Sequence, residues 1–367
     1  MIVYQQIRNT RVCLFRVETT PDVSVSWEST CEFLKIAFGK DVDHIPKPVK
    51  NMCDAVGLDD WSFWPTLLPA QTREQIIADR KADLLNAVSH TGNYIETWLK
   101  IRSFLDNLGT PDLDESMLRQ AVPKNHKSLF EKIRKGDTKP RYNTSGTSTG
   151  RLTITSGPNF LTLPRESRNA LRATQKGSSI YSIDFTSLEP RVALWMSSTK
   201  HPEEDVYATV MEMCDISDRA VAKLATLSSL YGAGVQRLSV TIGSQKRAKQ
   251  LIERVSNFFE IPECAKRLEH QAANGCVVNY FGRPLFEATK QPRVRVNHYI
   301  QSTAADLANL LFAELCKNNK EVTPLVLIHD ALIAEVPDES AVQFFDHCKN
   351  ISYDGFDFPT KIERMNI

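Results

Sequence analysis

Residues 324–336 read PLVLIHDALIAEV, an apolar run that is broken near its middle by His329 and Asp330. Two apolar runs around a short polar break are typical of two buried strands joined by a tight turn. Residues 178–185, SSIYSIDF, form another strand-like run, and Asp184 lies where this run gives way to a helical pattern. The sequence therefore predicts a buried sheet with one carboxylate at each of two strand ends.

A pair of carboxylates in an apolar setting is typical of a site for two Mg²⁺ ions. Hard cations prefer oxygen ligands, and the paired ions of phosphoryl-transfer sites lie about 3.5 to 4 Å apart, so two strand ends could hold both ions. Asp184 or Asp330 alone could equally well cap a turn. The metal-site hypothesis therefore depends on the two acids meeting in space.

Four residues recur at intervals of four in the segment 218–234, DRAVAKLATLSSLYGAG: Arg219, Lys223, Leu227 and Tyr231. Each advances about 40° beyond a full helical turn, so the four form one stripe along a helix. The stripe could hold a triphosphate with its two cations, cover the nucleotide with the apolar side chain and end with the aromatic ring near a paired base. An ordinary amphipathic surface helix has similar spacing and stays the alternative.

The charge of the 367-residue chain is nearly balanced, with 45 Lys and Arg against 44 Asp and Glu, but its distribution is uneven. Residues 124–176 contain twelve basic and three acidic residues, a net charge of twelve minus three, or +9. Within them, the segment RYNTSGTSTGRLTITSGPN supplies glycines and hydroxyls that allow close approach to phosphates. The pattern predicts contact with a nucleic-acid backbone, and a merely solvated basic face is the alternative.

The composition excludes several classes of protein. Hydrophobic residues make up 42% and charged residues 24%, which is typical of a globular chain with a large core. No run of 18 apolar residues and no apolar leader is present, so we expect a cytoplasmic chain that is neither secreted nor bound to a membrane. Eight scattered cysteines without a C-x-x-C pair argue against a zinc ribbon or a dense disulfide framework.

Five segments together resemble the polymerase domain of family A DNA polymerases, the DNA polymerase I-like enzymes, over roughly residues 141–340. In chain order they are TSTGRL, DFTSLEPRV, R-x-x-x-K-x-x-x-L-x-x-x-YG, N-x-x-x-QSTAADL and HDALIAEVP. The resemblance implies an α+β right-hand fold of thumb, palm with an antiparallel sheet, and fingers. The implied divisions are an N-terminal segment of unknown role (1–70), a helical thumb (71–140), the first palm part (141–198), the fingers (199–281) and the second palm part (282–367).

The resemblance also implies the metal site. Asp184 and Asp330, helped by the main-chain carbonyl of Phe185, would hold two Mg²⁺ ions, which Mn²⁺ could replace. Lys223 would be the proton donor to the leaving pyrophosphate. Ala331 stands where the family usually has a third acid, the least essential of the three, so catalysis is still expected.

Nucleotide and DNA contacts are implied in the same way. Arg219 and Lys223 would hold the triphosphate of a dNTP, and Glu189 would exclude a ribose 2′-OH. Leu227 stands where the family usually has an aromatic ring, so we expect weaker stacking on the incoming sugar. Tyr231 and Gly232 match the template-base position. The residues implied at the primer terminus, template or minor groove are Arg151, Asn159, Arg293, Asn297, Gln301 and His329.

The resemblance implies a template-directed DNA polymerase acting on primer–template DNA and dNTPs. The first 140 residues are too short for a thumb and an exonuclease, so we expect no proofreading or 5′ nuclease domain. Proofreading is then either absent or supplied in trans by a replisome or proofreading partner. Such a compact form is phage-like, which would place it in a host cytoplasm. A single-subunit RNA polymerase is one alternative, although Glu189 argues against it. A non-catalytic DNA-binding replisome component is another.

Overall fold

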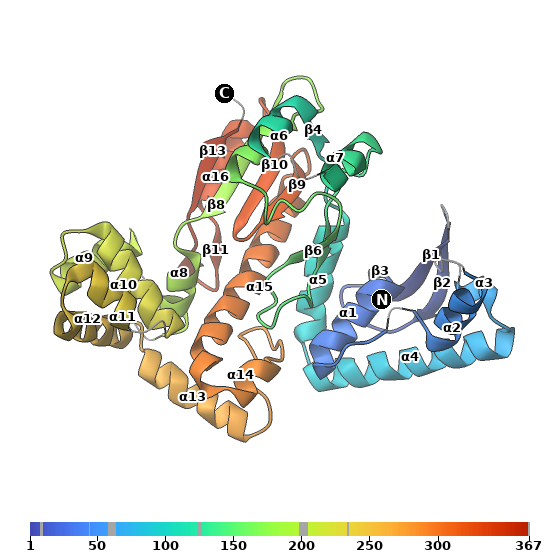
Figure 1. Cartoon of the computed structure of the whole chain (residues 1–367), viewed down its shortest axis with the longest axis horizontal. Helices are drawn as coiled ribbons and strands as arrows, with labels where there is room; N and C mark the ends of the chain where they lie inside the picture. Colours follow the sequence, from blue (N-terminus) through green and yellow to red (C-terminus); the bar gives the residue numbers. More distant parts are fainter. Residues whose placement is uncertain are drawn as a thin grey trace.

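The computed structural model of the chain describes residues 1–7, 10–43, 45–57, 64–122, 127–197, 205–232 and 235–365. Helices and sheets are mixed, which confirms the predicted α+β class. Figure 1 shows three parts: a central sheet with a long helix beside it, a helical group on one side, and a unit built from the N-terminal residues on the other.

The central sheet has four antiparallel strands in the order β13 (Thr360–Arg364), β8 (Ser178–Phe185), β10 (Ala331–Pro337) and β9 (Thr323–Ile328). The predicted strands therefore exist, and a two-residue turn joins β9 to β10. His329 in this turn has a φ of 57°, the left-handed conformation that tight hairpin turns require.

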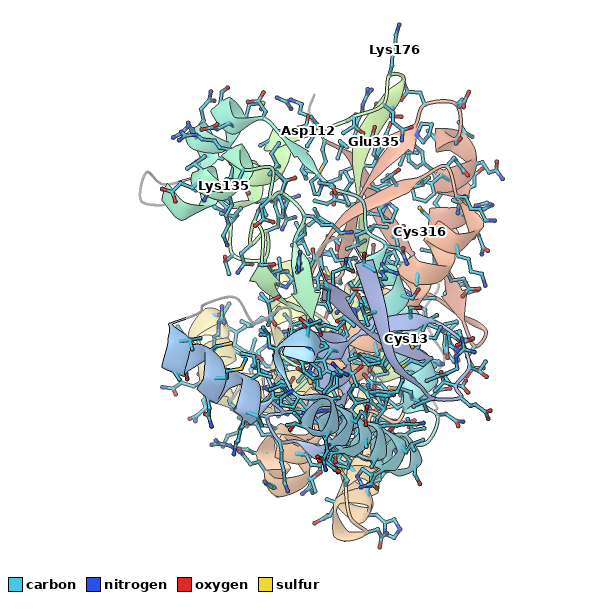
Figure 2. All side chains as sticks on the ribbon, turned by 90° about the vertical axis from the view of Figure 1, so that its right-hand side faces the viewer. Cys13, Asp112, Lys135, Lys176, Cys316 and Glu335 are labelled. Atoms are coloured by element: carbon cyan, nitrogen blue, oxygen red, sulfur yellow. The ribbon has the colours of Figure 1, made fainter. Side chains whose placement is uncertain are left out.

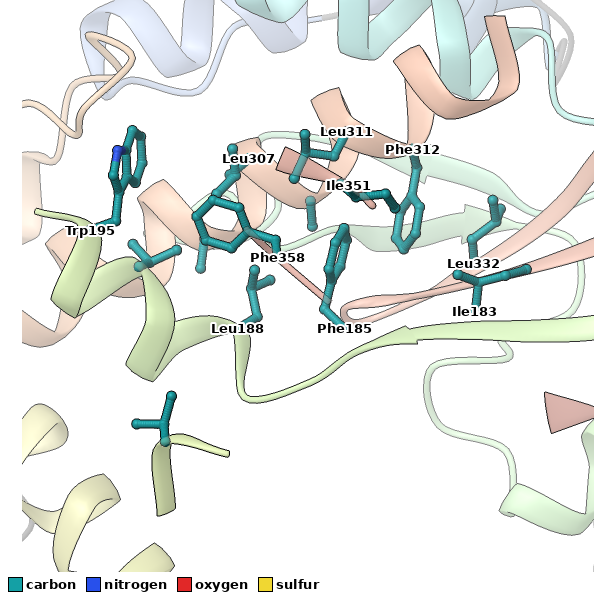
Figure 3. Close-up of a cluster of buried hydrophobic side chains, with 14 of the residues drawn as sticks. Ile183, Phe185, Leu188, Trp195, Leu307, Leu311, Phe312, Leu332, Ile351 and Phe358 are labelled. Atoms are coloured by element: carbon teal, nitrogen blue, oxygen red, sulfur yellow. The ribbon is translucent and has the colours of Figure 1, made fainter. Parts of the chain in front are cut away.

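One face of the sheet carries the main core. Ile183 and Phe185 of β8 are buried together with Leu332 of β10, and the ring of Phe185 lies 4.7 Å from that of Phe312 (Figure 3). Successive strand residues point to opposite faces, so Asp184 faces away from this core. The core is covered by α15 (Arg295–Asn318), α8 (Leu188–Trp195), α16 (Ala341–Lys349) and the small hairpin β11 (Ser352–Tyr353) and β12 (Phe356–Asp357).

The opposite face of the sheet is covered over part of its length by a smaller apolar cluster. Ile180 and Ile333 pack there with Phe160 and Leu171. The elements on this side are β4 (Asp112–Leu113), α6 (Glu115–Ala121), α7 (Lys127–Arg134), η1 (Arg165–Ala170) and β7 (Leu171–Arg172). The short hairpin of β5 (Arg141–Asn143) and β6 (Thr153–Ser156) instead packs against the main core through Tyr142 and Ile154. The basic segment runs through them, and Figure 2 shows Lys135 and Lys176 well apart on the surface. Lys124 lies outside the described residues.

The helical group packs around one helix. The small residues Ala222 and Ala225 of α10 are buried against its neighbours, whereas Arg219 and Lys223 stay exposed. The helices are α9 (Val206–Cys214), α10 (Arg219–Tyr231), α11 (Val235–Ile242), α12 (Gln245–Phe258) and α13 (Ile261–Ala273). The short elements α14 (Phe286–Lys290) and η2 (Pro292–Val294) then lead into α15.

In its described residues, the N-terminal unit contains a three-stranded sheet and five helices. Its apolar core extends from Met1 to Leu99, across residue 70, where the sequence places a boundary. That boundary and the other predicted divisions stay predictions. Figure 1 shows α4 running across the foot of α5 rather than alongside it. The elements are β1 (Ile2–Ile7), β2 (Thr10–Arg16), β3 (Ser24–Ser26), α1 (Trp27–Phe38), α2 (Lys47–Val56), α3 (Trp64–Leu67), α4 (Ala70–Thr91) and α5 (Tyr94–Asp106).

A buried polar network joins the N-terminal unit to the central part. The Arg283 guanidinium donates to the Tyr94 hydroxyl at 2.5 Å and lies 3.5 Å from the Asp306 carboxylate. It also donates to the main-chain carbonyl of Thr144. Gly150 has a φ of 75°, and a Cβ there would collide with the Arg283 guanidinium, so only glycine suits this close approach. In the described ranges, no helix is both long and apolar enough to cross a membrane.

Candidate active site

The two predicted carboxylates meet at one edge of the central sheet. Asp184 lies opposite Ala331 in the β8–β10 register, directly after Asp330 in the turn. Partial burial, and then the charge of Asp330, raise the pKa of Asp184 to about 6. Burial also raises the pKa of Asp330, although the charges of His329 and other nearby groups oppose the shift. The two carboxylates therefore repel each other until a proton or a cation neutralises part of their charge.

The chemistry of these donors suits a hard cation. The carboxylates of Asp184 and Asp330 come from two chain segments, the end of β8 and the β9–β10 turn, and the main chain of Phe185 joins these segments by a hydrogen bond to the Asp330 carbonyl. Ala331, the direct partner of Asp184, offers no third carboxylate. Among the residues that the structure describes, no group of three or more His, Cys, Asp or Glu side chains is arranged to hold a metal.

Glu189 is held between two partners at the start of α8. The Arg151 guanidinium forms an ion pair with one of its carboxylate oxygens, and the Tyr231 hydroxyl donates to the other. Burial raises the pKa of Glu189, and the charge of Arg151 opposes the shift. Ser187, just before α8, has a φ of 56°, and this bend begins the helix immediately after β8. The contacts join α8 both to the segment after TSTG and to the end of α10.

A cavity lies between α8, α15 and the β9–β10 turn. Small side chains of α15, among them Ala305 and Ala308, leave room beside it. The polar residues that line it are Arg151, Glu189, Gln301, Asn309, His329 and Asp330. All of these except Asn309 are predicted site residues, so the structure gathers five of them around one cavity. The five come from four separate segments of the chain.

The stripe of four residues on α10 lies on one side of the residues around the cavity. The Arg219 guanidinium binds the Asp205 carboxylate, with Nε 2.8 Å from Oδ2. Lys223 is exposed, and its charge lowers the pKa of Asp330, which places it on the side of the acidic pair. Leu227 is half-buried. Tyr231 ends the helix with its hydroxyl on Glu189.

The other predicted DNA contacts lie around the rim. Gly232 ends α10 with a φ of 62°, and a Cβ there would lie 3.9 Å from the carbonyl of Arg293. Arg293 is exposed in η2, and Asn159 is exposed on the turn after β6. Asn297 is half-buried one turn before Gln301 on α15, and its buried Oδ1 accepts no hydrogen bond from the described residues. Within the described part of the chain, none of these four residues forms a hydrogen bond or an ion pair with Asp184 or Asp330.

Residues 114–353, about two thirds of the chain, match the family model described as DNA polymerase family A. The chain belongs to this family. The family assignment confirms the resemblance that the five sequence segments carry.

Relatives of this family A chain include cellular and phage proteins. It is 27% identical to the thermostable DNA polymerase I of Thermus filiformis over 63% of its length and 32% of that protein. It is 26% identical to the DNA polymerase of Mycobacterium phage L5, over 54% of this chain and 35% of that one. The chain thus spans about a third of the length of these relatives.

The family fold is also visible in a solved structure. The POL domain of Pol1 from M. smegmatis, in complex with DNA primer-template and dNTP, superposes with a TM-score of 0.64. The match covers 91% of this chain and 80% of that one at 15% sequence identity. The similarity shows the polymerase-domain fold, in agreement with the predicted right-hand architecture.

Sequence reasoning on this family A chain missed three residues near the site. Asp205 and Tyr207 contact Arg219, and Asn309 lines the cavity. An acid before the apolar segment VYATVMEMC is a signal for a helix N-cap, and Asp205 does cap α9. Nothing in the local pattern indicates its contact with Arg219.

Proposed function

We propose that this chain is a DNA-directed DNA polymerase that adds dNTPs to a primer 3′-OH, directed by a template strand. The observation that carries the proposal is the meeting of Asp184 and Asp330, with the pKa of Asp184 raised to about 6. Two adjacent carboxylates that repel each other are a natural place for divalent cations. Family membership supports the same reaction.

Asp184, Asp330 and the carbonyl of Phe185 would hold two Mg²⁺ ions, for which Mn²⁺ could substitute. When bound, the ions would stabilise the charge that develops on the transferring phosphoryl group and favour the deprotonated primer 3′-OH. Ala331 leaves the position of a third acid without a ligand. Two carboxylates with raised proton affinity still supply the negative charge that such a site requires.

The chain's own residues would bind the nucleotide and orient it. Lys223 and Arg219 would hold the triphosphate along α10, while Leu227 would cover the sugar. The primer 3′-oxygen then forms a bond to the α-phosphorus, and the bond from that phosphorus to the bridging oxygen breaks in line. Lys223 would donate a proton to the departing pyrophosphate. Tyr231 and Gly232 would lie beside the template base.

Glu189 would select the sugar by shape. Its carboxylate is fixed by Arg151 and Tyr231, so it has little freedom to move away from a ribose 2′-OH. A deoxyribose would leave that space free. This contact favours a DNA polymerase over a single-subunit RNA polymerase.

Primer–template DNA would lie along the basic segment and the rim of the cavity. Phosphate contacts of Lys and Arg would supply most of the affinity without reading the sequence. The predicted contacts are Arg151, Asn159, Arg293, Asn297, Gln301 and His329. A replisome or proofreading partner in trans and a cytoplasmic location also stay predictions.

Primer extension on a defined template, with dNTPs and NTPs compared, tests the proposal. We expect dNTP addition that depends on Mg²⁺ and is lost in Asp330→Asn. Efficient addition of NTPs would instead favour the RNA polymerase alternative. DNA binding without extension under any of these conditions would favour the non-catalytic alternative and overturn the proposal.

A further inference from the structure

Arg219, one of the two cations proposed to hold the triphosphate, already binds an anion of the chain itself. Its Nε and Nη2 atoms lie 2.8 and 2.7 Å from the same carboxylate oxygen of Asp205, Oδ2. The guanidinium also lies over the ring of Tyr207, 5.0 Å from the ring centroid. The carboxylate therefore occupies the side of the guanidinium where a phosphate oxygen would bind.

Lys223, one turn further along α10, is in a different state. It is exposed, and within the described ranges it forms no ion pair. An incoming polyphosphate would thus meet one free cation and one that a carboxylate already neutralises. The two cations of the stripe are therefore unequal before the nucleotide binds.

Asp205 is held in place by its second oxygen. Oδ1 accepts a hydrogen bond from the main-chain N–H of Tyr207 at 3.0 Å and caps the first turn of α9. Arg219, by contrast, has a long side chain that is 55% exposed. When a phosphate competes for the guanidinium, we therefore expect Arg219 to move and Asp205 to remain.

We propose that Asp205 is a positioning residue that sets the affinity of α10 for polyphosphate. Its carboxylate stands in for a phosphate on Arg219, and a bound nucleotide must displace it. Because the triphosphate has several charged oxygens, it can compete with a single carboxylate. The inference rests on the proposed function, since it assumes that Arg219 meets the nucleotide.

Asp205→Asn separates the two tasks of this side chain. Asparagine is as good an N-cap as aspartate, so the α9 cap should remain while the charge on Arg219 is removed. Because the ion pair is partly exposed, we expect a gain of about two- to fivefold in affinity. The gain should be the same for a dNTP on the primer–template complex and for inorganic tripolyphosphate on the free chain, since the base and sugar do not touch this pair.

Two further variants complete the design. Asp218→Asn removes an equivalent charge from the N-cap of α10, where Asp218 accepts from Ala220 N–H at 2.7 Å, and it should leave both affinities unchanged. In an Arg219→Ala background, Asp205→Asn should have no further effect. Circular dichroism of each variant checks that the helices remain.

Equilibrium binding by calorimetry decides between the outcomes. Equal affinities in wild type and Asp205→Asn, a gain matched by Asp218→Asn, or a gain that persists without Arg219 would each overturn the inference. Failure of the proposed function would give a different result. The wild-type chain would neither extend a primer nor bind dNTPs or tripolyphosphate, and Asp205→Asn would restore neither extension nor binding.

Discussion

The main-chain N–H of Phe185 donates a hydrogen bond to the carbonyl oxygen of Asp330 across 3.2 Å. This bond ties the last residue of β8 to the turn between β9 and β10. Since Asp184 precedes Phe185 directly, the backbone alone keeps the two acids side by side, whichever rotamers they adopt. The proximity of the carboxylates is therefore a property of strand register.

Mg²⁺ should stabilise the folded chain through these two acids. A ligand that binds only the native state raises the melting temperature as its concentration exceeds the dissociation constant. We expect this rise in wild type and its loss in Asp184→Asn and Asp330→Asn, measured by differential scanning fluorimetry with a Mg²⁺ titration. Asp346→Asn, in an exposed ion pair on α16, is the matched control and should keep the rise. An unchanged rise in both site variants would contradict the metal assignment.

The pH dependence of stability should carry the signature of Asp184. Its pKa is raised from 3.8 in the ordinary state to about 6 in the folded chain, so the folded state holds a proton more tightly than the unfolded state. This contribution to stability is fully present below about pH 4 and is lost as pH rises through 6.

Asp184→Asn removes this titration, so without metal the variant should be more stable than wild type above pH 6. Because the residue is only partly buried, solvent screens its charge, and we expect a difference below about 1 kcal/mol in the free energy of unfolding. The difference should disappear near pH 4. Urea unfolding in EDTA at pH 4.5 and 7.5 measures it, and a constant difference across this range would refute the assigned shift.

Sugar selection should follow the size of the side chain at position 189. Glu189→Ala should raise the incorporation of NTPs relative to dNTPs, because it opens the space beside the 2′-OH. Glu189→Gln keeps the bulk of the side chain and should keep the selection. Steady-state kinetics with matched dNTP and NTP pairs compares the variants. If the glutamine variant relaxed selection as much as the alanine variant, charge rather than shape would be responsible.

Stacking on the incoming nucleotide can be tested at position 227. Leu227→Phe adds an aromatic face, which should strengthen dNTP binding by about 0.5 to 1.5 kcal/mol if the side chain meets the sugar. Apparent dNTP affinity in single-turnover extension is the measurement. An unchanged affinity would mean that this half-buried side chain does not reach the substrate.

Salt dependence should reveal whether the basic segment binds DNA. Each phosphate neutralised by Lys or Arg adds about 0.9 to the negative slope of log affinity against log salt. Replacing Lys132, Arg134 and Lys135 by alanine should flatten the slope measured by fluorescence anisotropy. A control that replaces the exposed Lys317, Lys320 and Lys349 should leave it unchanged. Identical slopes for both triple variants and wild type would identify the segment as a solvated face.

How much of this molecule is readable in its sequence depends on whether a feature is local. Apolar periodicity and turn chemistry, which involve residues only a few positions apart, predict several features. These are the strands β8, β9 and β10, the tight turn at His329 and the stripe on α10. The acids at the two strand ends, and the family to which the chain belongs, are likewise visible in short segments. These features depend on residues close in sequence, whose geometry is set by backbone dihedrals.

The tertiary structure alone decided which of these elements meet. Three contacts of the site each join different elements. They are the pairing of Ala331 with Asp184, the hydrogen bond from Tyr231 to Glu189, 42 positions away, and the ion pair of Arg219 with Asp205. The same holds for the crossing of α4 and α5, which brings together two helices by their packing (Figure 1). Local patterns leave the path of the chain open, because a strand can pair in several registers and a helix can pack at several angles. Burial of the whole core selects one arrangement, and that selection sets the chemistry of the site.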